Sequence, residues 1–137
     1  YSKHRREHVS LVFQDHNLID YLTPEENLRL VNPKADMKIL EDLGLSREES
    51  KRNIMHLSGG QRQRVAVGRA LVAPGRAILA DEPTGSLDPE MTDEVIDLLR
   101  HAAHQLGKCV IVVTHSKRVA DSADAVYTLR HKKLAKA

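Results

Sequence analysis

Two runs of wholly apolar residues constrain the fold of this 137-residue chain more than any other feature. They occupy residues 77–80 (AILA) and 110–113 (VIVV), and a helix-like pattern from Asp88 to Leu106 lies between them. Uninterrupted apolar strands are typical of parallel sheets, because such strands are buried on both faces. Parallel neighbours need a crossover connection, which is usually a helix. The pattern therefore predicts an α/β domain built on a parallel sheet.

The remaining elements follow from local patterns and caps. Two more strands are predicted, at 9–13 and 125–129, from their apolar residues. Helices are predicted after capping boxes and at apolar periodicities of three and four. The predicted helices begin at Thr23, Lys34, Ser46, Ser58, Asp88 and Ser116. The helix at Ser58 is expected to run to about Val72.

The order of these elements suggests a division within one domain. Residues 15–57 contain helical patterns only, so we expect them to form a helical insertion beside the sheet. Residues 58–137 return to alternating strands and helices. The sequence thus predicts a single, partial α/β domain over 1–137, with a helical segment and a core portion.

A pair of carboxylates directly follows the first apolar run. Asp81 and Glu82 stand at the end of the predicted strand 77–80. In open parallel sheets, ligands bind at the carboxyl ends of the strands. A carboxylate there can hold Mg²⁺, and a second can orient or deprotonate a water molecule. The plainer interpretation is a strand that ends in a solvated acidic turn, and these two residues alone do not decide between them.

A second candidate site is the start of the helix at Ser58. The first helical turn holds Gly59 and Gly60, although each glycine costs a helix about 1 kcal/mol relative to alanine. A helix N-terminus offers unpaired N–H groups to an anion, and glycines let the anion approach the backbone. Simple capping by Ser58 and Gln61 would explain those two residues but not the glycine pair.

Two polar residues follow other predicted strands. Gln14 comes after the strand 9–13, and His115 comes after the strand that starts at Val110. Both would face the same edge of the sheet as the carboxylates. Each alone is weak, because a lone histidine or glutamine at a strand end is more often an ordinary surface residue.

Taken in chain order, these motifs resemble the ABC ATPase family. The matching motifs are the Q-loop (Phe13-Gln14), the signature (Leu57-Ser58-Gly59-Gly60-Gln61), Walker B (residues 77–82), the D-loop (Ser86-Leu87-Asp88) and the H-switch (Thr114-His115). Residues 81–88 are most similar to the branch that includes lipoprotein-release, macrolide-export and peptide-export ATPases. That branch usually has Asp-Gly after the last strand, where this chain has Arg130-His131-Lys132.

The resemblance implies a role for each residue at the sheet edge. Asp81 would position Mg²⁺, and Glu82 would be the general base for the attacking water. His115 and Gln14 would contact the γ-phosphate region, with Gln14 also near the metal. The implied cofactors are therefore ATP and Mg²⁺.

The resemblance also implies partners. Ser58, Gly59 and Gly60, together with Gln61, would bind the γ-phosphate of ATP held by the other subunit of a head-to-tail dimer. Asp88 would cross the dimer interface and belong to the same nucleotide site. The helical stretch 15–57 would face a transmembrane permease subunit. The enzyme would then lie in the cytoplasm against the inner face of the cell membrane.

One motif of the family is absent from this sequence. A phosphate-binding loop needs Gly, four residues, Gly-Lys and Ser or Thr, and none of the seven glycines has another glycine five positions later. We therefore expect a chain truncated before that loop and inactive alone. In the family, the strand that leads into the loop lies between the strand before His115 and the strand at 125–129. Its loss would open the edge of 110–113, where we expect a second copy to pair.

Charge and spacing narrow the alternatives. The chain has 21 Lys and Arg against 19 Asp and Glu, which argues against a dedicated nucleic-acid binder. Chromosome-maintenance ABC ATPases have a coiled coil between the Q-loop and the signature, and residues 15–57 leave no room for one. The remaining alternative is a non-catalytic remnant that interacts with an intact ATPase or a membrane subunit.

Overall fold

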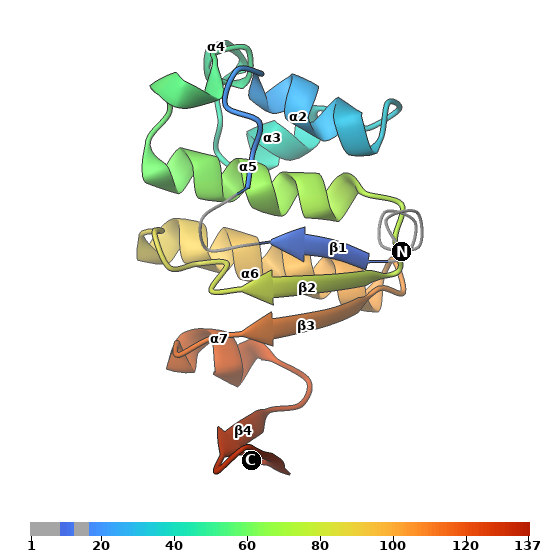
Figure 1. Cartoon of the computed structure of the whole chain (residues 1–137), viewed down its shortest axis with the longest axis vertical. Helices are drawn as coiled ribbons and strands as arrows, with labels where there is room; N and C mark the ends of the chain where they lie inside the picture. Colours follow the sequence, from blue (N-terminus) through green and yellow to red (C-terminus); the bar gives the residue numbers. More distant parts are fainter. Residues whose placement is uncertain (1–8, 13–16) are drawn as a thin grey trace.

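A parallel sheet forms the centre of the protein, as the sequence predicts. The computed structural model describes residues 9–12 and 17–137. Strands β1 (Val9–Val12), β2 (Ala77–Asp81) and β3 (Cys109–Val113) pair in the order β1-β2-β3, all parallel. Their arrows point the same way in Figure 1, so their carboxyl ends meet at one edge of the sheet.

The long helix α5 (Gly59–Val72) contacts both the sheet and the other helices. Helix α5 packs beside β1, and α6 (Pro89–His104) packs against β3 (Figure 1). Beyond α5 lies a helical segment within residues 17–57. It consists of α2 (Pro24–Val31), α3 (Lys38–Asp42), α4 (Arg47–Ser50) and the 3₁₀ helix η1 (Ile54–His56). The short helix α7 (Lys117–Ser122) follows β3.

One apolar core joins the sheet to the helical segment. Val12, Ile78 and Ala80 contribute from the sheet, and Leu28 and Leu40 contribute from the helices. All five side chains are at most 1% exposed. Because this cluster is continuous through α5, the signature helix is held rigidly between the sheet and the helical segment.

Capping explains most of the helix starts. Thr23 and Ser46 each accept a backbone N–H and form the expected capping boxes with Glu26 and Glu49. The helix predicted from Lys34 begins only at Lys38. Asn32 and Asp36 accept the N–H groups of Lys34 and Lys38, so side-chain turns replace the first helical turn.

The prediction that the strands are buried on both faces is wrong for the described part of the chain. Ile78 and Ala80 are fully buried beneath the helices, but Leu79, Ile111 and Val113 on the opposite face are 40%, 53% and 57% exposed. The apolar runs predict parallel strands correctly. They do not specify whether a cover is present on the second face, because burial depends on what packs there.

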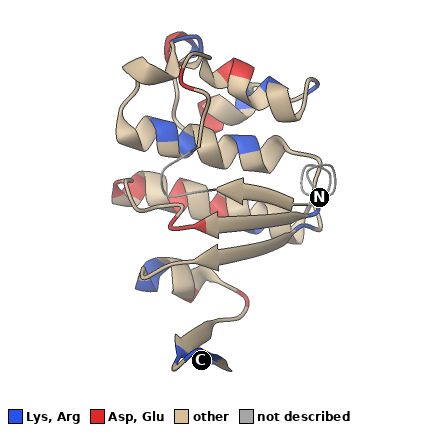
Figure 2. Cartoon of the chain, viewed as in Figure 1, with Lys and Arg blue, Asp and Glu red and all other residues tan. Residues whose placement is uncertain are grey.

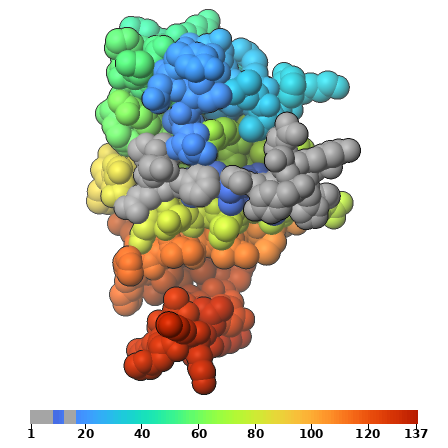
Figure 3. Space-filling view, viewed as in Figure 1, coloured from blue at the N-terminus to red at the C-terminus, as the bar shows by residue number. Residues whose placement is uncertain are grey.

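The C-terminal strand does not join the parallel sheet. Strand β4 (Tyr127–Arg130) pairs antiparallel with β5 (Lys133–Lys136), a strand that the sequence does not predict. The hairpin stands away from the body of the molecule in Figure 3. The strand predicted at 125–129 therefore does not close the edge of β3.

The hairpin turn provides a test of this arrangement. His131 and Lys132 form a two-residue loop with φ of 51° and 64°, a conformation that favours glycine. We expect Lys132→Gly to stabilise the hairpin by about 1 kcal/mol, because glycine removes the strain of a left-handed backbone. Slower hydrogen exchange in residues 127–136 would show this, and Lys136→Gly in strand β5 should have the opposite effect. Equal exchange rates in Lys132→Gly and the unmodified chain would contradict the turn geometry.

Candidate functional site

The carboxyl ends of β2 and β3 form the edge that the sequence marks as the site. Asp81 is the last residue of β2 and lies opposite Val113 in the parallel register. Its side chain is exposed. Acidic residues gather at this end of β2 and along α6 in Figure 2. The structure thus places a solvent-accessible carboxylate where a parallel sheet binds ligands.

The backbone of Glu82 leaves the strand in a left-handed conformation. Its φ is +48°, which is uncommon outside glycine and asparagine. The Glu82 N–H continues the ladder to the Val113 carbonyl at 2.8 Å. Its own carbonyl accepts the Gly85 N–H at 3.2 Å and the side-chain amide of Gln63 at 3.0 Å. Strain of this kind costs about 1–3 kcal/mol and is frequent at functional sites.

The carboxylate of Glu82 is held at the end of β3. One oxygen accepts the backbone N–H of His115 at 2.7 Å, and the other accepts the Thr114 hydroxyl at 3.1 Å. The Thr114 oxygen in turn accepts the Ser116 N–H at 2.9 Å. The structure therefore brings Glu82 and His115 together, but through the histidine backbone; the imidazole belongs to an exposed residue. A carboxylate oriented in this way suits proton abstraction from water.

The start of α5 lies at the same end of the molecule. Ser58 is the N-cap, and its hydroxyl accepts the Gln61 N–H at 3.1 Å. A Cβ on Gly60 would come within 3.2 Å of the Ser86 carbonyl, so Gly60 packs directly against the D-loop. A Cβ on Gly59 would meet nothing within 4 Å. Close packing within the described chain therefore explains the glycine at 60 but not the glycine at 59.

This contrast predicts opposite effects for two alanine substitutions. We expect Gly59→Ala to raise the free energy of unfolding by up to about 1 kcal/mol, because alanine favours the helix and has room. Gly60→Ala should lower it, because the new methyl group would press on the Ser86 carbonyl. Urea unfolding of both variants would measure the difference. Destabilisation by Gly59→Ala would show that the chain itself requires this glycine.

Gln61 is engaged within the chain. Its side-chain oxygen accepts the Ser58 N–H at 2.9 Å, and its amide donates to the carboxylate of Glu49 on α4. Hydrogen bonding to the Ser46 backbone lowers the pKa of Glu49, so that carboxyl favours its charged, accepting form. Gln61 thus links the signature to the helical segment.

Asp88 also has a local structural role. It is the N-cap of α6, and its carboxylate accepts the Met91 N–H at 2.8 Å. The residue is exposed, so its outer face remains open to a partner. Capping accounts for an aspartate at this position, and the dimer contact that the resemblance implies stays a prediction.

Of the two residues predicted to bind the metal, Asp81 and Gln14, the structure describes only Asp81. Gln14, predicted near the phosphate and the metal, lies outside the described residues. Within residues 9–12 and 17–137, no three His, Cys, Asp or Glu side chains converge as a complete metal site. Asp81 fits Mg²⁺ nonetheless, because this ion is commonly bound through one or two carboxylates together with substrate phosphates and water.

Gln63 and Thr114 belong to the site, although the sequence predicts a role there for neither. Both contact Glu82, one through its backbone and the other through its carboxylate. A signal for Gln63 was available, because it is a polar residue within the helix stripe that also contains the buried Val67 and Ala70. Thr114 lies in the H-switch pair, but its contact with the Glu82 carboxylate depends on the conformation of Glu82, which no local pattern predicts.

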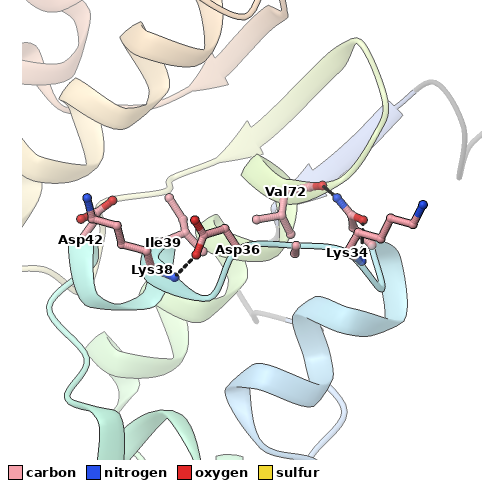
Figure 4. A pocket seen from close by; sticks show the side chains of 8 residues that line it. Lys34, Asp36, Lys38, Ile39, Asp42 and Val72 are labelled. Atoms are coloured by element: carbon pink, nitrogen blue, oxygen red, sulfur yellow. Dashed lines mark hydrogen bonds between the residues drawn. The ribbon is translucent and has the colours of Figure 1, made fainter.

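A separate pocket lies away from this edge. It has a volume of about 330 Å³ and is lined by residues of the α2–α3 connection, by α3 and by Val72 at the end of α5 (Figure 4). Asn32 donates to the Val72 carbonyl at 2.9 Å across it. Because Val72 is at the opposite end of α5 from Ser58, this pocket is not part of the candidate site.

A parallel sheet with paired carboxylates at its edge, beside a glycine-opened helix start, is an arrangement suited to binding and cleaving phosphate groups. Residues 1–85 match the family described as ABC transporter. This chain belongs to the ABC transporter family.

Relatives and solved structures agree with this assignment. The chain is 41% identical to the lipoprotein-releasing system ATP-binding protein LolD of Rickettsia prowazekii, over 90% of this chain and 60% of that protein. It is 39% identical to the macrolide export ATP-binding/permease protein MacB of Escherichia coli K12, over 92% of this chain and 21% of that protein. The ATP-binding cassette MJ0796, a dimer bound to ADP and Pi, superimposes with a TM-score of 0.87 at 32% identity, over 98% of this chain and 65% of that one.

These comparisons also show how much of each relative's length the chain covers. It covers 58% of an ABC transporter ATP-binding protein of Bacillus subtilis, YclH, to which it is 36% identical over 88% of its own length. The chain thus spans about three fifths of the length of YclH and of LolD. None of the helices in the described residues is both long and apolar enough to cross a membrane.

Proposed function

We propose that this chain is part of the ATP-hydrolysing subunit of a membrane transporter, in which hydrolysis drives transport. The observation that carries the proposal is the geometry of Glu82. Its carboxylate is oriented by His115 and Thr114 at the edge of the sheet, one residue beyond the exposed Asp81. The names of the relatives, which include lipoprotein release and macrolide export, support a transport system rather than another use of ATP.

At this edge Glu82 acts as the general base for the attacking water. Asp81 would hold Mg²⁺, which would neutralise charge on the phosphates. His115 and Gln14 contact the γ-phosphate region. Thr114 keeps the Glu82 carboxylate directed along the end of β3, at 3.1 Å.

The signature acts on a nucleotide held by a second subunit. Open space around Gly59 supports this role, because no neighbour in the described chain requires a glycine there. Ser58, Gly60 and Gln61 form the same surface, with Asp88 at the subunit contact. The dimeric state reported for the cassette MJ0796 is consistent with such a head-to-tail pair.

A transmembrane permease subunit is the second partner that we propose. The name of MacB, an ATP-binding/permease protein, couples the two functions. The helical segment over 15–57 is the surface that we assign to the permease. Its exposed large apolar side chains include Tyr21 at 77% and Met55 at 63%. Such a subunit lies in the cytoplasm against the inner face of the membrane.

The alternative is a non-catalytic interaction module. Such a module would need no Gly-x₄-Gly-Lys sequence, and these 137 residues contain none. The two proposals are separated by ATP hydrolysis in a subunit that contains this chain together with a phosphate-binding loop. Turnover that depends on Glu82 supports the enzyme, and its absence supports the module.

We further propose that the 137-residue chain self-associates through β3. This strand pairs only with β2 in the described chain, and Ile111 and Val113 are more than half exposed. An unprotected apolar edge readily pairs with another copy. Light scattering should therefore show a dimer or larger species, and Val113→Lys should shift it towards the monomer. Leu30→Lys, a matched change at an exposed leucine of α2, should not. A monomeric chain at about 100 μM would contradict the proposal, because at that concentration even a micromolar contact would be filled.

A further inference from the structure

The proposed mechanism gives no role to the buried amide of Gln63. Gln63 is on α5 and is 1% exposed. The other buried residues of this helix, such as Val65, Val67 and Ala70, are apolar or glycine. Burying an amide is unfavourable unless it forms hydrogen bonds, so a core glutamine requires an explanation beyond packing.

A hydrogen bond from Gln63 reaches Glu82, whose backbone is strained. Its Nε2 donates to the Glu82 carbonyl at 3.0 Å. Glu82 has the left-handed φ of +48°. In this conformation its backbone and its side chain contact different elements. Its carbonyl faces α5, and its carboxylate reaches Thr114 and His115 at the end of β3.

We infer that Gln63 is a positioning residue for Glu82, and that it couples the orientation of the general base to the signature helix. The coupling is structural. Gln63 is two residues after Gln61 on the same helix, so a displacement of the helix start would be transmitted to the Glu82 backbone. The significance of this link for turnover rests on the proposed role of Glu82 as the base.

The first test uses the 137-residue chain and does not depend on activity. The His115 N–H, which donates to Glu82 at 2.7 Å, reports on the position of the carboxylate. Selective ¹⁵N-histidine labelling reduces the spectrum to eight backbone signals, one per histidine. Gln63→Met and Gln63→Glu both remove the donor to the Glu82 carbonyl, so the Glu82 carboxylate should shift and its hydrogen bond from the His115 N–H should weaken. We therefore expect the His115 amide proton to move upfield in both variants. Circular dichroism selects the variant that keeps the native fold.

Val67→Ala is the matched control. Val67 is fully buried on the same helix, one turn beyond Gln63, and its loss destabilises the core without removing a donor to Glu82. The His115 signal should stay in place in this variant despite a lower melting temperature. An unmoved His115 signal in the Gln63 variants would overturn the inference, as would an equal shift in Val67→Ala.

The second test measures turnover in a subunit that also contains a phosphate-binding loop. Loss of the hydrogen bond to the Glu82 carbonyl should lower kcat about threefold to tenfold, with KM for ATP changed by less than about twofold. Val67→Ala should leave both kcat and KM for ATP unchanged. If the His115 signal shifts and kcat does not fall, Gln63 does not position the base for catalysis. If Glu82→Gln itself hydrolyses ATP normally, the proposed role of Glu82 fails, while the structural link to Gln63 is judged by the His115 signal alone.

Discussion

Replacing Glu82 by glutamine should slow ATP hydrolysis by about 10²–10⁴-fold in a subunit that contains this chain and a phosphate-binding loop. Glutamine keeps the length and shape of the side chain, and its oxygen can still accept the His115 N–H that now lies 2.7 Å from the carboxylate. It cannot accept a proton from water. Single-turnover measurements should therefore show a large loss in the chemical step, with ATP affinity nearly unchanged.

A matched control separates this effect from a simple change of charge. Glu90 is an exposed carboxylate in the first turn of α6, outside the proposed machinery. Glu90→Gln removes the same charge and should retain full turnover. Wild-type hydrolysis by Glu82→Gln would show that another group takes the proton, and the catalytic role of Glu82 would then have to be abandoned.

The sequence predicts the parallel sheet and the helix starts for physical reasons that are local. Apolar runs and capping boxes act over a few residues, so β2, β3 and the helix caps at Thr23, Ser46 and Ser58 are found where expected. The carboxyl-edge rule then places the candidate residues without knowledge of the full fold.

What the sequence does not predict depends on contacts between distant segments. The left-handed turn at Glu82 is stabilised by Gln63 on α5 and by the end of β3, so no local sequence pattern predicts it. The exposure of Leu79 and Ile111 could not be predicted either, because an apolar strand has the same sequence pattern whether or not another layer covers it. In both cases the energy that decides the conformation comes from tertiary packing, which propensity does not contain.

The hairpin β4–β5 illustrates a different limit. Its turn residues, His131 and Lys132, are poor candidates for two successive positive φ angles. The strand after them is rich in lysine, so its sequence does not indicate a buried strand. Antiparallel pairing between Tyr127–Arg130 and Lys133–Lys136 nevertheless satisfies their backbone groups, which outweighs the unfavourable turn.

The second large effect concerns ATP binding by the 137-residue chain itself. We expect a dissociation constant in the millimolar range or weaker, which corresponds to a binding free energy of about −4 kcal/mol or less in magnitude. Most phosphate contacts in such enzymes come from the backbone N–H groups and the lysine of the phosphate-binding loop, and this sequence contains no such loop.

The residues that are present cannot substitute for that loop. Asp81 and Glu82 are acidic and repel the phosphates unless a cation lies between them. Ser58 and Gly59 are proposed to face a nucleotide that another subunit holds, so they supply only the second half of a site. Calorimetric titration with Mg-ATP should therefore show no saturable heat up to about 1 mM, whereas a subunit with the loop should bind in the micromolar range under the same conditions. Micromolar binding by this chain alone would mean that its own residues form a complete nucleotide site, and the division of the site between two subunits would then be wrong.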